Sequence, residues 1–424
     1  VSLPFNRAAN GLTPAFADLI QDTFDLVSSV LGVFDPYAWR TKHGPGAVSD
    51  PSSDRFKYRF ENWPPELEPV FPYADFAFAN FGLWADSLLS GSVANNHTGV
   101  SRLIAVPKTQ KGPRLIAAEP TANQWCQQAL LDFFATRVAK TWISEFITFR
   151  DQSGNQNLAR QGSIDGNLIT VDLSAASDRL TCRLVERAFR RNPSLLRALH
   201  ACRTRFLSQN IDKKMPKLLR LKKFSTMGSA CTFPVQSLIF FSIGLASALY
   251  ADGKYPSLLT ISDYIGRIRV FGDDIIVPKA AGVHLFDALA YLSFRVNADK
   301  TYTEGNFRES CGVEAYKGVD VTPSYVRCVE ETSTPHSVSS TVEVSNNFFI
   351  RGWWHAAQAI QRRVQHVRDV RVVAVESGLF GLKSFCGSLV PSKLIRWCER
   401  LQLDFLPSRV LKSTQARAKV EHSG

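Results

Sequence analysis

Residues 268–277 read IRVFGDDIIV, and this stretch decides how the chain folds. Two short apolar runs flank a Gly-Asp-Asp tip, a pattern typical of a β-hairpin in a core sheet. Gly272 gives the turn its backbone freedom and leaves Asp273 and Asp274 at the exposed end. Adjacent carboxylates repel each other unless a cation neutralises them. The tip is therefore either a polar turn or a platform for a hard divalent ion such as Mg²⁺.

A second acidic site lies in VDLSAASD, residues 171–178. Residues 168–173 are predicted to form a buried strand that ends in Asp172, with Asp178 after a turn of small residues. Asp172 can join Asp273 and Asp274 in binding two Mg²⁺ ions, with Mn²⁺ as an alternative. Such a pair activates a 3′-hydroxyl and stabilises the leaving pyrophosphate. The plainer alternative for Asp172 is an N-cap of the turn that follows.

Positive charge is concentrated in one part of the chain. The formal net charge is +12, and residues 183–223 hold thirteen Lys and Arg against two acids, a local balance of +11. Residues 1–86, by contrast, hold six bases and eleven acids. A run this basic favours a surface that faces nucleic acid over a set of solvated helix faces. The RNA-binding residues predicted in this run are Arg183, Arg187, Arg190, Lys213, Lys214, Lys217, Lys222 and Lys223.

Two further segments suit a nucleotide. In VPKTQKGPRLIAAEP, residues 106–120, Lys108, Lys111 and Arg114 recur every three residues and are predicted to neutralise a triphosphate, although a solvated basic loop has the same pattern. In FSTMGSACTFPVQS, residues 224–237, a small-residue loop allows close approach of the backbone to a ligand. Capping of a helix N-terminus explains this loop equally well. Its predicted nucleotide-binding residues are Gly228, Ser229, Thr232 and Gln236.

The periodicity of the rest predicts helices interleaved with few strands, hence an α+β fold with a small antiparallel sheet. The stretch 233–251 has no formal charge but contains Pro and Gln, which favours a buried core helix over a membrane span. Eight scattered cysteines without a CxxC pair indicate reduced thiols and a cytoplasmic setting. The predicted helices are 16–31, 123–139, 183–207, 233–251 and 282–292, with strands to about 328 and mostly helix from 346.

In chain order these elements resemble the motif series of viral RNA-dependent RNA polymerases. Longer strings narrow the resemblance to the replicase subunit of the single-stranded RNA bacteriophages, the leviviruses, over residues 40–360. The strings are HGPGAV at 43–48, DQSGNQNLARQGSIDG at 151–166, DLSAASD at 172–178, FRESCG at 307–312 and GVDVTPSYVR at 318–327.

The resemblance implies a right-hand polymerase with fingers, palm and thumb. Asp172, Asp273 and Asp274 would hold the metal, Asp178 and the 228–236 loop would recognise the ribose, and Lys300 in VNADKT (296–301) would give a proton to pyrophosphate. The implied regions are 1–165 (N-terminal region and fingers), 166–182 (palm), 183–223 (basic fingers insertion), 224–330 (palm with the hairpin) and 331–424 (thumb).

The implied partners are template and product RNA, NTPs and host elongation factors Tu and Ts, in the cytoplasm of an infected bacterium and without a membrane. Met227 and Gln236 depart from the Ser and Asn that most viral RNA polymerases have at these places. Two alternatives stay open. A reverse transcriptase-like enzyme would share the carboxylates, but the residues around them, Phe271-Gly272 and Ser177-Asp178, favour an RNA product. A non-catalytic RNA-binding protein would explain the basic run but would leave the three carboxylates at two strand ends without a role.

Overall fold

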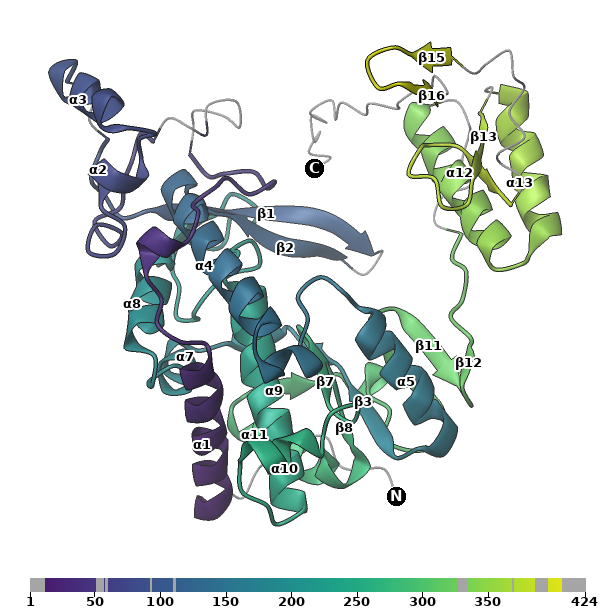
Figure 1. Ribbon diagram of the computed structural model, residues 1–424, viewed down its shortest axis with the longest axis horizontal. Coiled ribbons are helices and arrows are strands. Elements are labelled where there is room, and N and C mark those ends of the chain that lie inside the picture. The colour runs from purple at the N-terminus through teal and green to yellow at the C-terminus, as the bar shows by residue number, and fades with distance from the viewer. Residues whose placement is uncertain are drawn as a thin grey trace. The chain divides into compact units, whose positions relative to one another are not determined.

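The computed structural model describes residues 12–50, 57, 60–91, 94–109, 112–326, 334–367, 370–385 and 396–405. The chain divides into two compact units, Val1–Thr322 and Pro323–Gly424 (Figure 1). The predicted α+β class with small antiparallel sheets is confirmed. The five regions expected along the chain stay a prediction.

The acidic hairpin belongs to a three-stranded antiparallel sheet in the order β3-β8-β7. β7 is Arg269–Phe271, β8 is Asp274–Pro278 and β3 is Leu168–Val171. Phe271 pairs with Asp274, so the turn consists of Gly272 and Asp273, and Gly272 has a φ of 65°. Because β3 is antiparallel to β8, its end at Val171 pairs with Ile275 and brings Asp172 to the same edge as the turn.

Both faces of this sheet are covered, which explains why Ile275, Ile276 and Val277 are apolar without alternation. Ile275 and Val277 belong to the main core and lie against Gly244 of α9 (Thr232–Ala251). Ile276 faces the other way and clusters with residues of α5 (Ser153–Asp165). Successive side chains point to opposite faces of a strand, so a continuous apolar run is what a twice-covered sheet requires.

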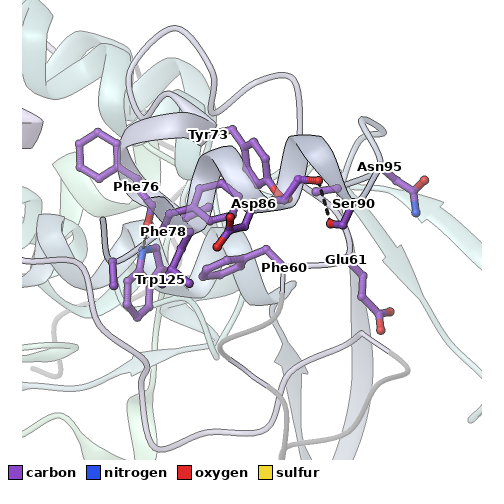
Figure 2. Close-up of a pocket in the computed structure, with 14 residues that line it drawn as sticks. Phe60, Glu61, Tyr73, Phe76, Phe78, Asp86, Ser90, Asn95 and Trp125 are labelled. Carbon is purple, nitrogen blue, oxygen red and sulfur yellow. Dashed lines mark hydrogen bonds between the residues drawn. The ribbon is translucent and has the colours of Figure 1, made fainter. Parts of the chain in front are cut away.

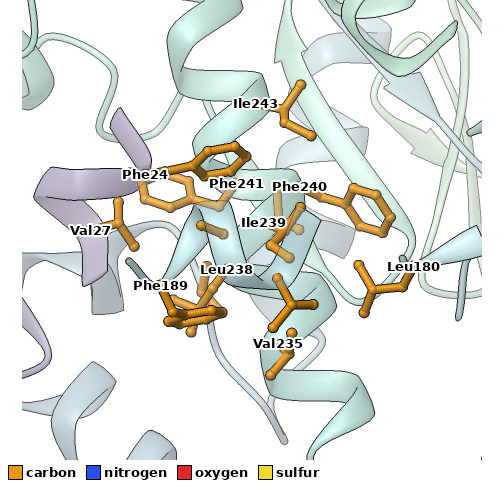
Figure 3. Packing of buried hydrophobic residues seen from close by; sticks show 14 of the residues in the cluster. Phe24, Val27, Leu180, Phe189, Val235, Leu238, Ile239, Phe240, Phe241 and Ile243 are labelled. Atoms are coloured by element: carbon orange, nitrogen blue, oxygen red, sulfur yellow. The ribbon is translucent and has the colours of Figure 1, made fainter. Parts of the chain in front are cut away.

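The helix α9 is the centre of the first unit. It contacts α1 (Pro14–Val30), α4 (Thr121–Ala139) and α11 (Gly282–Tyr291) as well as the sheet. Figure 3 shows Ile239, Phe240 and Phe241 of α9 packed among side chains from other elements. Among the described residues, α9 is the one helix with the length and hydropathy to cross a membrane, and 94% of that stretch is buried inside the structure. Its apolar surface therefore builds the core, as predicted.

The first unit also contains a four-stranded sheet. Its strand order is β2-β1-β5-β6, with β1 at Val100–Thr109, β2 at Gly112–Ala118, β5 at Phe206–Ser208 and β6 at Leu218–Arg220. β1 and β2 are antiparallel, with Val106 opposite Arg114. The basic segment 106–120 is thus a hairpin rather than one extended strand. The side chains of Lys108 and Lys111 lie outside the described residues.

The predicted single helix over residues 183–207 is wrong. The structure has α7 at Cys182–Ala188, α8 at Pro193–Cys202 and then strand β5. Proline at the first position of α8 cannot continue a preceding helix, and the Asn192 side chain caps α8 by accepting from the Leu195 backbone N–H. The Asn192 amide also donates to the carbonyl oxygens of Ser28 and Gly32, which fastens this break to α1.

The remaining elements of the first unit are short. The helices are α2 (Tyr73–Phe76), α3 (Phe81–Leu89), α6 (Ala176–Arg179) and α10 (Leu258–Ser262), with 3₁₀ turns at Pro36–Ala38, Trp142–Glu145, Lys279–Ala281 and Ala298–Lys300. The strands are β4 (Leu173–Ser174), β9 (Arg295–Val296), β10 (Phe307–Ser310), β11 (Val313–Tyr316) and β12 (Val319–Asp320). Strands β10, β11 and β12 form an antiparallel sheet, so the strand-rich stretch after residue 292 is confirmed.

The second unit begins with two helices, α12 (Pro335–Ile350) and α13 (Trp354–Val367), which contact each other. Four short strands follow within the described residues, where mostly helix was predicted from residue 346. They are β13 (Val372–Ala374), β14 (Leu382–Ser384), β15 (Arg396–Cys398) and β16 (Leu403–Phe405). The prediction is wrong there because strands of three residues are too short to show a period in the sequence.

One buried arginine joins the strand that leads to Asp172 to its neighbour β10. The side chain of Arg308 is 0% exposed, and its Nε donates to the Leu168 carbonyl oxygen at 2.5 Å. Its Nη atoms donate to the carbonyl oxygens of Phe307 at 2.6 Å, Gly305 at 3.0 Å and Gly166 at 3.3 Å. A guanidinium in this position satisfies several backbone acceptors that burial has removed from water.

We expect Arg308→Lys to lower the free energy of unfolding by about 2–3 kcal/mol, because a lysine ammonium cannot reach all of these carbonyl oxygens. Urea denaturation measures this change. Arg160→Lys is the matched control: Arg160 is half exposed in an ion pair with Asp320, and its replacement should cost at most about 0.5 kcal/mol. Equal effects of the two substitutions would contradict the structural role of Arg308.

Candidate active site

The edge of the hairpin sheet opens into a cavity of about 790 Å³. Nine of the twelve residues predicted for catalysis, metal binding or nucleotide binding line it. They are Arg114, Asp172, Gly228, Ser229, Thr232, Gln236, Asp273, Asp274 and Lys300. These residues come from five separate segments, so the fold assembles what the sequence keeps apart.

Asp172 is held in place by the segment that follows β9. Its side-chain Oδ2 accepts from Asn297 Nδ2 at 2.6 Å, and its backbone carbonyl accepts from the Asn297 N–H at 2.9 Å. Its own backbone N–H donates to Thr301 Oγ1 at 3.2 Å. The carboxylate therefore has a fixed direction, with one oxygen bound to an amide.

Asp274 begins β8 and is half-buried. Burial is the main cause that raises the pKa of Asp274 to about 7, and the charges of Asp273 and Asp172 raise it further. Burial, opposed by the hydrogen bond from Asn297, likewise raises the pKa of Asp172. The Cys311 thiol donates to Asp274 Oδ2 at 3.6 Å. Three carboxylates thus repel one another at one cavity wall, an arrangement that a cation would relieve.

The donor atoms of this wall suit a hard cation. Mg²⁺ and Mn²⁺ take carboxylate oxygens, and the three aspartates supply them from two strand ends. Among the described residues, no three His, Cys, Asp or Glu side chains stand close enough together to form a ready-made metal site. A metal would have to draw these carboxylates closer and add oxygens from a substrate, as is usual for Mg²⁺.

Lys300 lines the same cavity and is paired. Its Nζ lies 2.8 Å from Glu309 Oε1. The hydrogen bond to Glu309 is the main cause that raises the pKa of Lys300, with smaller contributions from Asp172 and Asp274. The ammonium is therefore a fixed positive charge next to the carboxylates. Its assignment as a proton donor stays a prediction.

The loop before α9 lies against strand β2. The Ala117 N–H donates to the Met227 carbonyl oxygen at 2.7 Å, and Gly228 has a φ of 138°. A Cβ atom at Gly228 would lie 1.9 Å from the Ala117 carbonyl oxygen. Gly228 thus allows the loop to approach β2 closely, and β2 is the strand that also carries Arg114.

Two buried polar atoms in the cavity wall have no hydrogen-bond partner within the described part of the chain. They are Ser177 Oγ and Gln236 Oε1, whose residues are 5% and 6% exposed. A buried polar atom without a partner is costly, so a ligand group that came within reach of either atom would be bound favourably. Gln236, which departs from the usual Asn at this position, still places an amide side chain in the wall of this cavity.

Asp178 does not line the cavity. The short helix α6 turns its exposed carboxylate away, and it forms an ion pair with Lys223. Ser177, one residue earlier, faces the cavity instead. Two residues predicted for different roles, ribose recognition and RNA binding, are thus partners of each other.

The other predicted RNA-binding residues are spread over several elements. Arg183 and Arg187 lie on α7 and line a separate cavity against α1, and Arg190 forms an ion pair with Asp25 of α1 at 2.5 Å. Four lysines are exposed in the segment between β5 and α9: Lys213, Lys214, Lys217 and Lys222. The run is continuous in sequence but is divided among several helices and strands.

A second cavity, of about 890 Å³, shares no lining residue with the first, and Figure 2 shows the side chains in its wall. Aromatic rings from Phe60, Tyr73, Phe76 and Trp125 line it, and Asp86 of α3 is also in its wall. No predicted site residue borders it, so size alone does not identify the chemistry here.

Sequence reasoning did not assign several residues of the site. Asn297 lies within VNADKT, and Glu309 and Cys311 lie within FRESCG, strings that carried the resemblance without a role for these side chains. Ser177 lay beside Asp178 in the acidic motif. The motifs that contain these residues were recognised in the sequence. The direction of each side chain, however, depends on the pairing of strands that lie far apart in the sequence.

Comparisons with known proteins identify the family of the chain. Residues 77–359, about two thirds of the chain, match the family described as RNA replicase, beta-chain. The RNA-directed RNA polymerase beta chain of Escherichia phage MS2 is 37% identical over 53% of this chain and 37% of its own length. The RNA-directed RNA polymerase subunit beta of Escherichia virus Qbeta is 36% identical over 54% of this chain and 35% of its own length.

The matched regions cover less than half the length of these curated relatives. Among solved structures, an RNA-dependent RNA polymerase of a human picorbirnavirus aligns with a TM-score of 0.42 and 10% identity, over 64% of this chain and 58% of that one. By the extent of the family match, the chain belongs to the RNA replicase beta-chain family.

Proposed function

We propose that this protein is an RNA-directed RNA polymerase that replicates a viral RNA genome by transfer of nucleotides from NTPs to an RNA 3′-hydroxyl. The observation that carries the proposal is a single cavity lined by Asp172, Asp273 and Asp274, by cationic Arg114 and by unpaired polar atoms. Family membership supports it, since the relatives are named RNA-directed RNA polymerases.

The three aspartates would hold two Mg²⁺ ions, or Mn²⁺ in their place. Such ions lower the pKa of the attacking hydroxyl and neutralise charge on the leaving oxygen. The part of the protein is to keep the carboxylates at one edge: Asn297 orients Asp172, and the two-residue turn carries Asp273. The repulsion among the aspartates supports a cation as their counter-charge.

The nucleotide would lie between β2 and the hairpin. Arg114 would contact the triphosphate, together with Lys108 and Lys111 from the same hairpin segment. Ser177 Oγ and Gln236 Oε1 would pair with ribose hydroxyls, which is how a polymerase tells ribose from deoxyribose. Lys300 would give a proton to the pyrophosphate.

The exposed lysines between β5 and α9 would contact template or product RNA through phosphates. The resemblance also implies host elongation factors Tu and Ts as partners and the cytoplasm of an infected bacterium as the location. Both belong to this proposal.

Asp273→Asn should reduce primed RNA synthesis with NTPs and Mg²⁺ roughly a thousandfold, because one charge that holds the metal is lost. Extension of a labelled RNA primer measures the rate, and chelation of the metal by EDTA should abolish it in the wild type. Asp287→Asn is the control, since Asp287 is exposed on α11 and does not border the cavity. Equal rates for wild type and Asp273→Asn would disprove the metal site.

Gln236→Leu should lower the preference for NTPs over dNTPs about tenfold, because the side chain keeps its bulk but loses the oxygen that pairs with the sugar. The ratio of incorporation efficiencies with ATP and dATP measures the preference. Ser242→Ala on the same helix is the control, since the Ser242 hydroxyl donates within α9 to the Leu238 carbonyl oxygen. An unchanged ratio in Gln236→Leu would exclude Gln236 from sugar recognition.

A further inference from the structure

A buried carboxylate outside the cavity wall connects the two sides of the site. Glu119 directly follows β2 and is 2% exposed. Four side chains donate hydrogen bonds to it, two to each oxygen. Oε1 accepts from Ser101 Oγ at 3.2 Å and Thr226 Oγ1 at 3.0 Å, and Oε2 accepts from Gln127 Nε2 at 3.2 Å and from Thr204 Oγ1.

Such a group is expensive to bury. No lysine or arginine within the described residues forms an ion pair with Glu119. Burial is the main cause that raises its pKa, and the four hydrogen bonds oppose the rise. A carboxylate buried without a cation requires most of its lone pairs to be satisfied, and this one has four donors.

The four donors belong to four different segments. Ser101 is on β1, Gln127 is on α4, and Thr204 lies between α8 and β5. Thr226 is the fourth, and it alone belongs to the loop before α9, whose next residues Met227, Gly228 and Ser229 line the active-site cavity.

From Thr226 the contacts continue into the cavity wall. The Thr226 carbonyl oxygen accepts from Thr232 Oγ1 at 2.7 Å and from the Ser229 N–H at 3.3 Å. Gln127 supports the same loop, since its Oε1 accepts from the Ala230 N–H at 3.2 Å. The loop is thus fastened on both sides of Met227, the residue that bonds to β2.

We propose that Glu119 is a positioning residue for sugar selection: through Thr226 it fixes the loop that borders the ribose side of the cavity against the strand that carries Arg114. This inference rests on the proposed polymerase function. With the loop fixed, the distance between the triphosphate side and the sugar side stays constant, so a missing 2′-hydroxyl leaves polar groups unpaired and is penalised. A loop free to shift would tolerate the smaller sugar.

Glu119 could instead only stabilise the fold, without an effect on sugar selection. Substitution of two buried threonines distinguishes this structural role from the positioning role. Thr204 and Thr226 are 5% and 4% exposed, and both donate to Glu119. Thr204→Val and Thr226→Val each remove one hydroxyl at constant volume. If Glu119 only stabilised the fold, the two variants would behave alike.

The experiment measures incorporation of ATP and dATP by the full chain on a primed RNA template, with kcat and KM for each, alongside thermal unfolding. Thr226→Val should lower the ATP-to-dATP preference about tenfold, equivalent to the loss of one hydrogen bond to a charged group, mainly through the KM for ATP. Thr204→Val should keep the wild-type preference despite a similar fall in Tm, and Thr226→Ser should restore it. Equal preference in Thr226→Val and Thr204→Val would overturn the proposal.

Glu119→Gln tests the same inference without removing a threonine. Gln127 Nε2 can only donate, so the new amide must present its oxygen to Gln127 and Thr204 and its NH₂ group to Ser101 and Thr226. Ser101 and Thr226 must then accept from the NH₂ group instead of donating to a charged oxygen, and of these two only Thr226 belongs to the cavity loop. Because the bond to the loop is weakened, this variant should follow Thr226→Val rather than Thr204→Val. A wild-type preference in Glu119→Gln would also overturn the proposal. Absence of RNA synthesis by the wild type would instead refute the proposed polymerase function.

Discussion

The two-residue turn between β7 and β8 is the constraint on which the site depends. Gly272 adopts a φ of 65°, and its N–H donates to Ser237 Oγ of α9 at 3.1 Å. A Cβ atom there would lie 2.6 Å from the ring of Phe233 on the same helix. The turn therefore packs against α9, a helix that is buried along most of its length. Two carboxylates that repel each other are held together because the hairpin beneath them cannot move away from the core.

The same helix explains why the site can be both charged and rigid. α9 begins at the loop that borders the cavity and continues into the core, where Phe240 and Phe241 are fully buried. Burial of each such side chain contributes about 1.5–3 kcal/mol. Favourable packing on one side of the sheet thus offsets unfavourable electrostatics at its edge. Arg308 holds β3 in a different way: its side chain, on β10, donates to the Leu168 carbonyl oxygen of the strand that leads to Asp172.

The sequence predicts the features that depend on neighbouring residues better than those that depend on contacts between residues far apart in the chain. The hairpin, the core helix and the strand before Asp172 follow from local patterns, and each is present at nearly the expected bounds. The break between α7 and α8 also has a local signal, since Asn192 and Pro193 are typical residues for the start of a helix. The prediction treated the whole basic region as one helix and so missed this signal. The direction of Asp178 could not be predicted, because its partner Lys223 is 45 residues away and on another element.

Buried polar groups show most clearly what cannot be predicted from the sequence alone. The partners of Glu119 lie 8, 18, 85 and 107 residues away in sequence, so no window of the sequence contains the set. Taken locally, Glu119 is one acid after a strand, next to a proline. In the fold it is the point where two sheet strands, a helix and a cavity loop meet. A residue of this kind can be recognised only when a structure shows that a costly burial is fully compensated, and that compensation in turn shows which segments must stay together.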